Sequence, residues 1–139
     1  MSQCNTLLVH CMDFRLIKGI KKYMEDMGLT GDCDLVSVAG AAKNISNPGD
    51  VFDTQFVLKQ VGLSHDLHHI KKIILMNHLD CGAYGGARAF ATPEEEHAKH
   101  VTDLKAAAEA IKQKYPDLLI AMVIAKFLDD GDLGFEEIA

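Results

Sequence analysis

One stretch of this sequence, KIILMNHLDCG at residues 72–82, joins a short apolar run to a polar segment. Its first half, residues 72–76, carries two β-branched isoleucines and has the length of a strand, so we predict a buried strand there. The second half begins where that strand ends, and it contains His78 and Cys81 with two residues between them. Because ligands of α/β proteins bind beyond the carboxyl ends of the strands, this segment indicates where a site should be sought.

The rest of the chain alternates between strand-like and helix-like segments. Further strands are predicted at three places, and one more segment forms either a fifth strand or a helical tail: residues 6–10, 34–38 and 118–125, then 133–138. Helices are predicted over residues 15–27, 51–61 and 93–115, the last with the start signal Thr92-Pro93-Glu94-Glu95. Strands separated by helices favour right-handed crossovers. The expected fold class is α/β, with a central, mainly parallel β-sheet of four to five strands flanked by helices.

Length, composition and charge exclude several classes of protein. The chain has 139 residues, of which 48% are hydrophobic and 24% charged, and this predicts a single globular domain over residues 1–139. Fourteen basic and 20 acidic residues give a net charge of −6, which disfavours nucleic acid as a partner. No apolar run approaches the roughly 18–20 residues that a bilayer span needs, and no secretory signal is visible. We expect a cytoplasmic protein that does not bind membranes.

Two of the predicted strands end in residues that could hold a metal ion. The first is followed by Cys11-Met12-Asp13-Phe14-Arg15, and the third by the segment that contains His78 and Cys81. Carboxyl ends of parallel strands share one rim, so Cys11, His78 and Cys81 are expected to meet there. Thiolate and imidazole are preferred zinc ligands, and three protein ligands leave a fourth position open, as in catalytic zinc sites. The alternative for each cysteine alone is a buried core residue.

The two motifs together resemble the β-class carbonic anhydrases. Cys11-x-Asp13-x-Arg15 and His78-x-x-Cys81-Gly82 match that family in order and in strand placement, and the resemblance extends from about residue 6 to about residue 130. It implies that Cys11, His78 and Cys81 bind one Zn²⁺ per chain and that Asp13 and Arg15 form a catalytic dyad beside the open position. It further implies reversible hydration of carbon dioxide to bicarbonate by zinc-bound hydroxide, in a homodimer or a higher even-numbered homo-oligomer.

The residue chemistry of Asp13 and Arg15 agrees with that implied role. A carboxylate beside the open position would accept a hydrogen bond, and a guanidinium would keep the carboxylate ionised. A salt bridge at the start of a helix is the alternative reading of this pair. Whether water or Asp13 itself fills the fourth zinc position stays open.

The similarity also extends to Val38-Ala39-Gly40, which resembles the glycine-containing turn after the family's second strand. Ser37 and Val38, however, occupy positions where the family commonly has arginine and asparagine. This departure keeps two alternatives: a non-catalytic or weakly active zinc-binding protein, or a hydrolase of carbonyl sulfide or carbon disulfide. A thiol phosphatase is disfavoured because the spacing from Cys81 to Arg88 is one residue too long for a loop that cradles a tetrahedral anion.

The remaining cysteines and histidines are interpreted as structural. Cys4 and Cys33 precede their strands and should lie, inert, at the opposite rim. Three histidines, His65, His68 and His69, are expected in a solvated loop before the third strand. Another pair, His97 and His100, is expected on an exposed face of the long helix.

Overall fold

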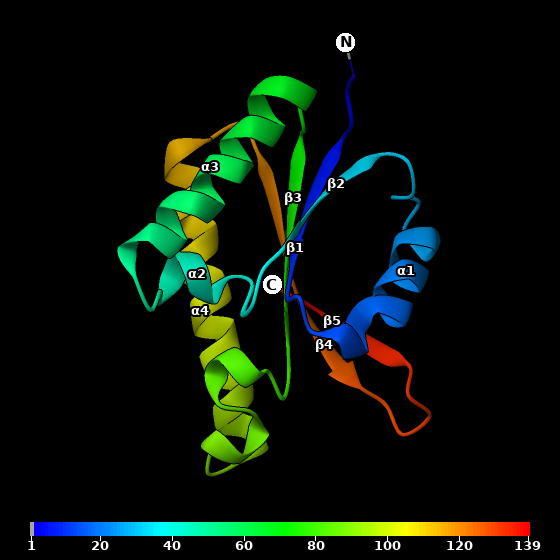
Figure 1. Cartoon of the computed structure of the whole chain (residues 1–139), viewed down its shortest axis with the longest axis vertical. Coiled ribbons are helices and arrows are strands. Elements are labelled where there is room, and N and C mark those ends of the chain that lie inside the picture. Colours follow the sequence, from blue (N-terminus) through cyan, green and yellow to red (C-terminus); the bar gives the residue numbers. More distant parts are fainter. Residues whose placement is uncertain (1) are drawn as a thin grey trace.

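The computed structural model describes residues 2–139 and contains a twisted five-stranded sheet (Figure 1). The strands are β1 (Thr6–His10), β2 (Cys33–Ser37), β3 (Lys72–His78), β4 (Leu119–Phe127) and β5 (Leu133–Ile138). Their order in the sheet is β2-β1-β3-β4-β5, with β1 to β4 parallel and β5 antiparallel to β4. The predicted fold class is confirmed, and the segment 133–138 is the fifth strand rather than a helical tail.

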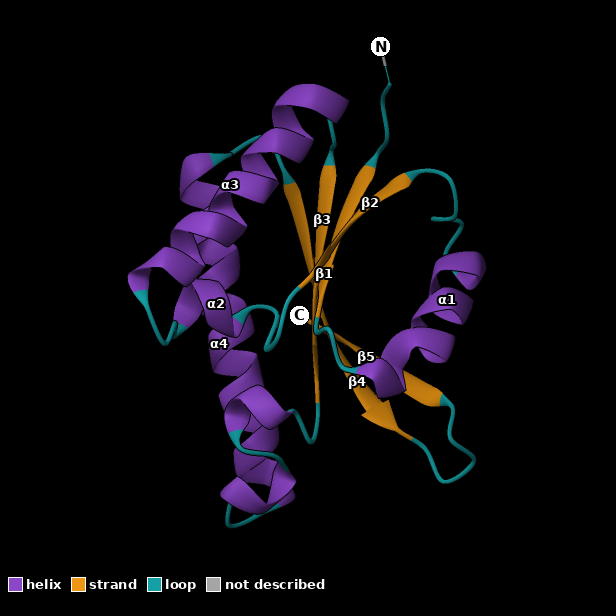
Figure 2. Cartoon of the chain, viewed as in Figure 1, coloured by secondary structure: helices purple, strands orange, loops and turns teal. Residues whose placement is uncertain are grey.

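Helices cover both faces of this sheet (Figure 2). They are α1 (Ile17–Asp26), α2 (Lys43–Ser46), α3 (Val51–His68) and α4 (Pro93–Lys114), with short 3₁₀ turns η1 (Phe14–Leu16), η2 (Gly82–Tyr84) and η3 (Ala87–Ala89). One face carries α2, α3 and α4, and the other carries α1. None of the described helices combines the length and the apolar character that crossing a bilayer requires.

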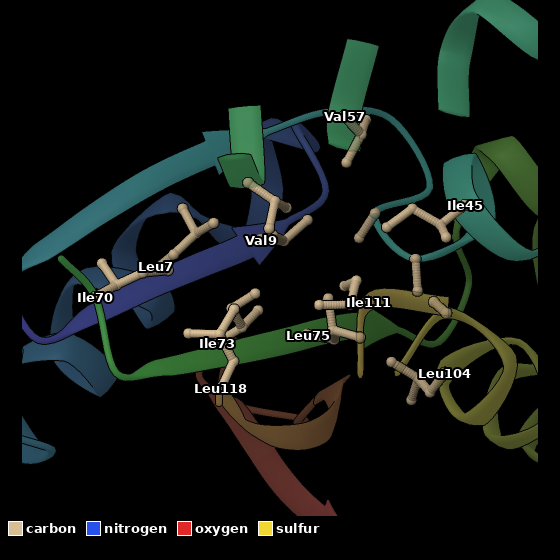
Figure 3. Close-up of a cluster of buried hydrophobic side chains, with 14 of the residues drawn as sticks. Leu7, Val9, Ile45, Val57, Ile70, Ile73, Leu75, Leu104, Ile111 and Leu118 are labelled. Carbon is tan, nitrogen blue, oxygen red and sulfur yellow. The ribbon is translucent and has the colours of Figure 1, made fainter. Parts of the chain in front are cut away.

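The core is divided between the two faces because side chains alternate along each strand. On the first face, inward-pointing residues of β1 and β3 pack against α3 and α4 (Figure 3): Leu7, Val9, Ile73 and Leu75 with Val57, Val61, Leu104 and Ile111. On the second face, the residues between them pack against η1 and α1: Leu8, Ile74 and Met76 with Leu16, Ile20 and Tyr23. Burial on both faces explains why β1 and β3 are apolar throughout.

The start of α4 follows its sequence signal. The Oγ1 atom of Thr92 accepts a hydrogen bond from the backbone N–H of Glu95 at 3.1 Å, and Pro93 occupies the first helical position. A capping box of Asp50 and Asp53 starts α3 in the same manner.

The predicted end of α3 near residue 61 is wrong, because the helix continues to His68. The expected histidine loop is therefore the end of a helix, with His65 and His68 in the last turn and His69 as the residue that caps it. The helix stops at His69, whose φ of 56° is left-handed.

Candidate metal centre

The carboxyl ends of β1 and β3 bring the three predicted ligands together. Cys11 directly follows β1, His78 is the last residue of β3, and Cys81 follows after a short loop. All three side chains are buried. One ligand atom from each lies within 4.8 Å of the other two, and the Sγ atoms of Cys11 and Cys81 are 3.9 Å apart.

His78 has a buried ring nitrogen with no hydrogen-bond partner among residues 2–139. Its Nδ1 atom lies 2.8 Å from the carbonyl oxygen of Leu79, so Nδ1–H donates there and Nε2 carries the lone pair. Nε2 makes no hydrogen bond to any residue that the structure describes. A buried acceptor without a partner is costly, and metal-ligating histidines commonly donate their other N–H to a carbonyl oxygen. A metal ion at Nε2 would resolve this cost.

The two thiols influence each other strongly. Hydrogen bonding from Cys81 lowers the pKa of Cys11, and the resulting thiolate raises the pKa of Cys81. The backbone N–H of Gly40 also points at the Cys11 sulfur, at 3.5 Å. These hydrogen bonds favour the thiolate form of Cys11, and a divalent cation would also favour loss of the proton from Cys81. Two thiolates and one imidazole are a donor set that fits zinc.

Asp13 and Arg15 lie beside this cluster. The Oδ1 atom of Asp13 accepts the backbone N–H of Arg15 at 2.9 Å, which starts η1. Both carboxylate oxygens also accept guanidinium hydrogen bonds, the shortest of them 2.6 Å, and these lower the pKa of Asp13. Asp13 Oδ2 is only 3.8 Å from the Nε2 atom of His78. An ionised carboxylate therefore faces the unpartnered ligand atom.

Arg15 connects the two halves of the site. Its guanidinium donates to the Asp80 carboxylate at 3.1 Å and to the Asp80 carbonyl oxygen at 3.0 Å, and it stacks on Phe127. Hydrogen bonds from Ala87 N–H and from Arg15 lower the pKa of Asp80.

The ligand loop is tightly turned around the carbonyl oxygen of Cys81. Backbone N–H groups of Tyr84 and Gly86 donate to that oxygen at 3.0 and 2.9 Å. Gly86 has a φ of 79°, and a Cβ atom there would lie 3.2 Å from the carboxylate of Asp80. A glycine is therefore required at this position.

An open pocket of about 1090 Å³ lies in front of the cluster. Cys11, Asp13, Arg15, Asp80 and Arg88 are among its lining residues. The exposed side chains of Met12 and Phe14 give the same pocket an apolar wall. A small uncharged molecule could reach the metal-ligand cluster through it.

Several buried residues beneath the loop escape sequence reasoning. Glu96, His100 and Asp103 of α4 are all buried. The expectation that His100 lies on an exposed face is wrong: burial lowers its pKa to about 4, so it is neutral at pH 7. Its position four residues before Leu104, on the apolar stripe of the helix, is the signal that identifies it as buried.

A second group of possible ligands lies at the opposite rim: Cys4, Asp34 and His68, again within 4.8 Å of one another. Here the polar atoms have partners, because Asp34 Oδ2 accepts from His68 Nδ1 at 2.7 Å and from Ser64 Oγ at 2.6 Å. Burial, followed by the charge of Asp34, raises the pKa of Cys4, which keeps that thiol protonated. His68 is thus part of a polar cluster and not of a solvated loop, while the inertness of Cys4 stays a prediction.

Comparison with known proteins connects the chain to one family. A family model described as "Putative carbonic anhydrase" matches residues 1–137. An uncharacterized protein of Rickettsia conorii is 34% identical over 123 residues, which are 86% of this chain and 66% of that protein. Another, from Rickettsia bellii, is 36% identical over 123 residues, 86% of this chain and 75% of that protein. The chain thus spans just under two thirds of the Rickettsia conorii relative.

Solved structures of β-carbonic anhydrases share the fold. The carbonic anhydrase of Streptococcus mutans superposes with a TM-score of 0.59 at 20% identity, over 99% of this chain and 83% of the other. The β-carbonic anhydrase CcaA gives a TM-score of 0.60 at 13% identity, over 100% and 78%. A chain from the crystal structures of two tetrameric β-carbonic anhydrases of Sordaria macrospora gives a TM-score of 0.50 at 16% identity. The match covers 100% of this chain and 84% of the other.

Proposed function

Because this chain belongs to the carbonic anhydrase family, we propose that it is a zinc-dependent enzyme that hydrates carbon dioxide reversibly to bicarbonate. The single observation that carries the proposal is the buried cluster of Cys11, His78 and Cys81, in which Nε2 of His78 has no hydrogen-bond partner within the described part of the chain. Cys11 of that cluster lines an open pocket with an apolar wall, as a small gaseous substrate requires.

The three ligand atoms would hold one zinc ion per chain: the Sγ atoms of Cys11 and Cys81 and Nε2 of His78. When bound, zinc would supply a Lewis acid that makes a water molecule acidic enough to ionise near neutral pH. The Nδ1–H of His78 donates to the Leu79 carbonyl oxygen and so keeps Nε2 free for the ion.

The chain's own group for orienting the nucleophile is Asp13. Its Oδ2 atom faces the ligand cluster, so it can accept a hydrogen bond from the nucleophile and orient it toward the substrate. Arg15 keeps this carboxylate ionised and prevents it from accepting a proton in the neutral range. Asp13 and Arg15 therefore orient the reacting water, and the apolar wall of Met12 and Phe14 receives carbon dioxide.

We also infer a homodimer, or a higher even-numbered assembly, in the cytoplasm. Exposed aromatic side chains such as Phe52 and Phe56 would be covered by a second copy of the chain. All four cysteines are free thiols, which suits a reducing compartment. A monomeric mass by light scattering would contradict the proposed assembly.

Stopped-flow hydration of carbon dioxide tests the activity. The zinc-loaded protein is expected to accelerate hydration above buffer between roughly pH 7 and 9. The Cys81→Ser variant should lose both zinc and activity. The Cys33→Ser variant, changed at the start of β2 and away from the proposed ligands, should retain both. A fully zinc-loaded protein with no rate above buffer would overturn the catalytic proposal and leave the fold unaffected.

A weakly active or non-catalytic zinc protein is the second candidate, and the exposed Ser37 and the apolar Val38 favour it. Neither brings a positive charge to the rim. The apolar Val38 also suits carbonyl sulfide or carbon disulfide, uncharged analogues of carbon dioxide. Release of hydrogen sulfide from either compound, without hydration of carbon dioxide, would favour that alternative.

A further inference from the structure

Three charged or polar side chains interrupt the buried face of α4. Glu96, His100 and Asp103 follow one another at helical spacing and are 4%, 0% and 3% exposed. Buried polar groups are costly unless they form hydrogen bonds that the structure needs. The same helix face continues with apolar Leu104 and Ile111, so a fully apolar face was available to the fold.

Each of the three side chains contacts a different residue of the segment that carries two proposed ligands. Glu96 Oε2 accepts the backbone N–H of Asp80 at 2.7 Å, next to Cys81. Asp103 Oδ2 accepts the hydroxyl of Tyr84 at 2.7 Å. The third contact, between His100 and Asn77, lies immediately before His78.

Asn77 extends these contacts toward the remaining ligand. Its Nδ2 atom donates to His100 Nδ1 at 3.0 Å and to Tyr84 Oη at 3.1 Å, and its Oδ1 atom accepts the backbone N–H of Ala42 at 3.0 Å. Ala42 belongs to the turn whose Gly40 N–H points at the Cys11 sulfur. The network therefore reaches all three ligand-bearing segments.

The loop needs this support because its backbone is unusual at Asp80. Asp80 is not a glycine, yet its φ is 57°, a left-handed conformation that side-chain-bearing residues rarely adopt. The hydrogen bond from its N–H to Glu96 holds that conformation from the helix side.

We propose that Glu96, His100 and Asp103 are positioning residues of α4 that hold the loop and its neighbours in the geometry required to bind the metal. This inference rests on the proposed zinc site. His100 Nδ1 must accept a hydrogen bond from Asn77, so the proton lies on Nε2, which has no partner among the described residues. The unpartnered N–H at Nε2 is a cost to the fold. A histidine at this position in spite of that cost agrees with a need for Nδ1 as the acceptor for Asn77.

Zinc affinity, measured by competition with a chelator, tests the proposal. Glu96→Ala should weaken zinc binding about 10- to 100-fold, the usual effect of losing a contact that orients metal ligands. Glu96→Gln retains an acceptor for the Asp80 N–H and should stay within a few-fold of the wild type. Glu109→Ala, changed at an exposed position of the same helix, should leave the affinity unchanged.

Tyr84→Phe provides a second route if Glu96→Ala fails to fold. The change removes only the hydroxyl that joins Asn77 to Asp103, and it should weaken zinc binding roughly 2- to 10-fold. Tyr23→Phe, on the other face of the sheet, is its matched control. In Tyr84→Phe the absorption bands of bound Co²⁺ should also shift relative to the wild type, whereas a change that only destabilises the fold would not move them.

Wild-type affinity and an unchanged Co²⁺ spectrum in both Glu96→Ala and Tyr84→Phe would overturn the proposal. So would equal losses of affinity in Glu96→Ala and Glu109→Ala. Failure of the zinc site itself is distinguishable, because Cys81→Ser would then bind zinc as the wild type does. Failure of catalysis alone leaves the affinity measurements intact.

Discussion

The two rims of the sheet carry similar side chains and differ in how those side chains are used. At one rim, a buried nitrogen of His78 has no hydrogen-bond partner among residues 2–139, and hydrogen bonding lowers the pKa of Cys11. At the other, His68 and Asp34 bond to each other, and the nearby Cys4 stays protonated. Residue composition therefore does not distinguish a metal site from a polar cluster, whereas unsatisfied ligand atoms do.

Serine substitution of one cysteine at each rim should give the largest difference between the two rims, and the property that differs is zinc binding. Cys81→Ser removes a thiolate ligand and is expected to abolish zinc binding, because two remaining ligands cannot hold the ion at the protein's working concentration. Cys4→Ser should retain one zinc per chain. Metal analysis after dialysis measures both, and a full zinc complement in Cys81→Ser would contradict the ligand assignment.

The carboxylates at the two rims offer the next largest contrast. Asp13→Asn should keep zinc but lower kcat/KM for hydration by about 10²-fold or more and alter its pH profile, because the charged acceptor beside the cluster is lost. Asp34→Asn, at the other rim, should leave kcat/KM unchanged. Stopped-flow assays across the pH range compare the two, and equal effects would remove the special role of Asp13.

His100, beneath the metal rim, predicts that the protein loses stability as the pH falls. Burial depresses the pKa of His100 from 6.5 to about 4. Between these pH values His100 is therefore protonated in the unfolded chain and neutral in the folded chain. Its contribution is complete above about pH 6.5 and is lost as the pH falls toward 4. Between these two pH values the free energy of unfolding should fall by about 3 kcal/mol.

Urea unfolding of the metal-free protein at several pH values measures this contribution. His100→Gln, which keeps an acceptor for Asn77, should be less stable at neutral pH but should show a shallower loss below pH 6.5 than the wild type. Identical slopes in the two proteins would show that another group causes the pH dependence.

Sequence reasoning located the metal rim because its information is local. Strand-like runs end at Cys11 and His78, and the parallel topology alone brings such ends together. It misplaced His100 because pairing it with His97 suggested a polar face, whereas its spacing from Leu104 shows the buried one. Glu96 escaped notice since acids in the first turn of a helix are already explained by the dipole.

The opposite rim was harder to predict because its contacts are long-range. Asp34 pairs with His68 and Ser64, which lie on a helix some thirty residues later in the chain. No periodicity in either segment indicates that pairing. The same holds for Asp80, whose left-handed backbone depends on a glutamate of α4.

Asp34→Asn should have a moderate effect on stability. Burial alone would raise the pKa of Asp34, but hydrogen bonds from Ser64 and His68 lower it overall. Replacing the carboxylate leaves two donors with a weaker acceptor, so we expect a loss of about 1–2 kcal/mol in unfolding free energy. Thermal unfolding checks this, and an accompanying loss of zinc would break the distinction between the two rims.

The smallest effect is expected at His65, and its sign is opposite to that of His100. Both ring nitrogens face carboxylates, Asp66 at 2.9 Å and Asp117 at 3.0 Å, and both can donate only when the ring is protonated. These partners raise the pKa of His65 above 6.5. Its contribution is therefore complete below pH 6.5 and is lost as the pH rises through the elevated pKa.

Because Asp66 and Asp117 are largely exposed, solvent and salt screen both pairs, and His65 should contribute less than about 1 kcal/mol. NMR titration of the His65 ring gives the pKa directly, and comparison with His65→Gln at low and high salt gives the stability. A pKa at or below 6.5 would contradict the two ion pairs. An elevated pKa of His65, set against the depressed pKa of His100, would show that the pKa values of imidazoles on the two helices shift in opposite directions. Burial dominates at His100, whereas His65 lies between two carboxylates.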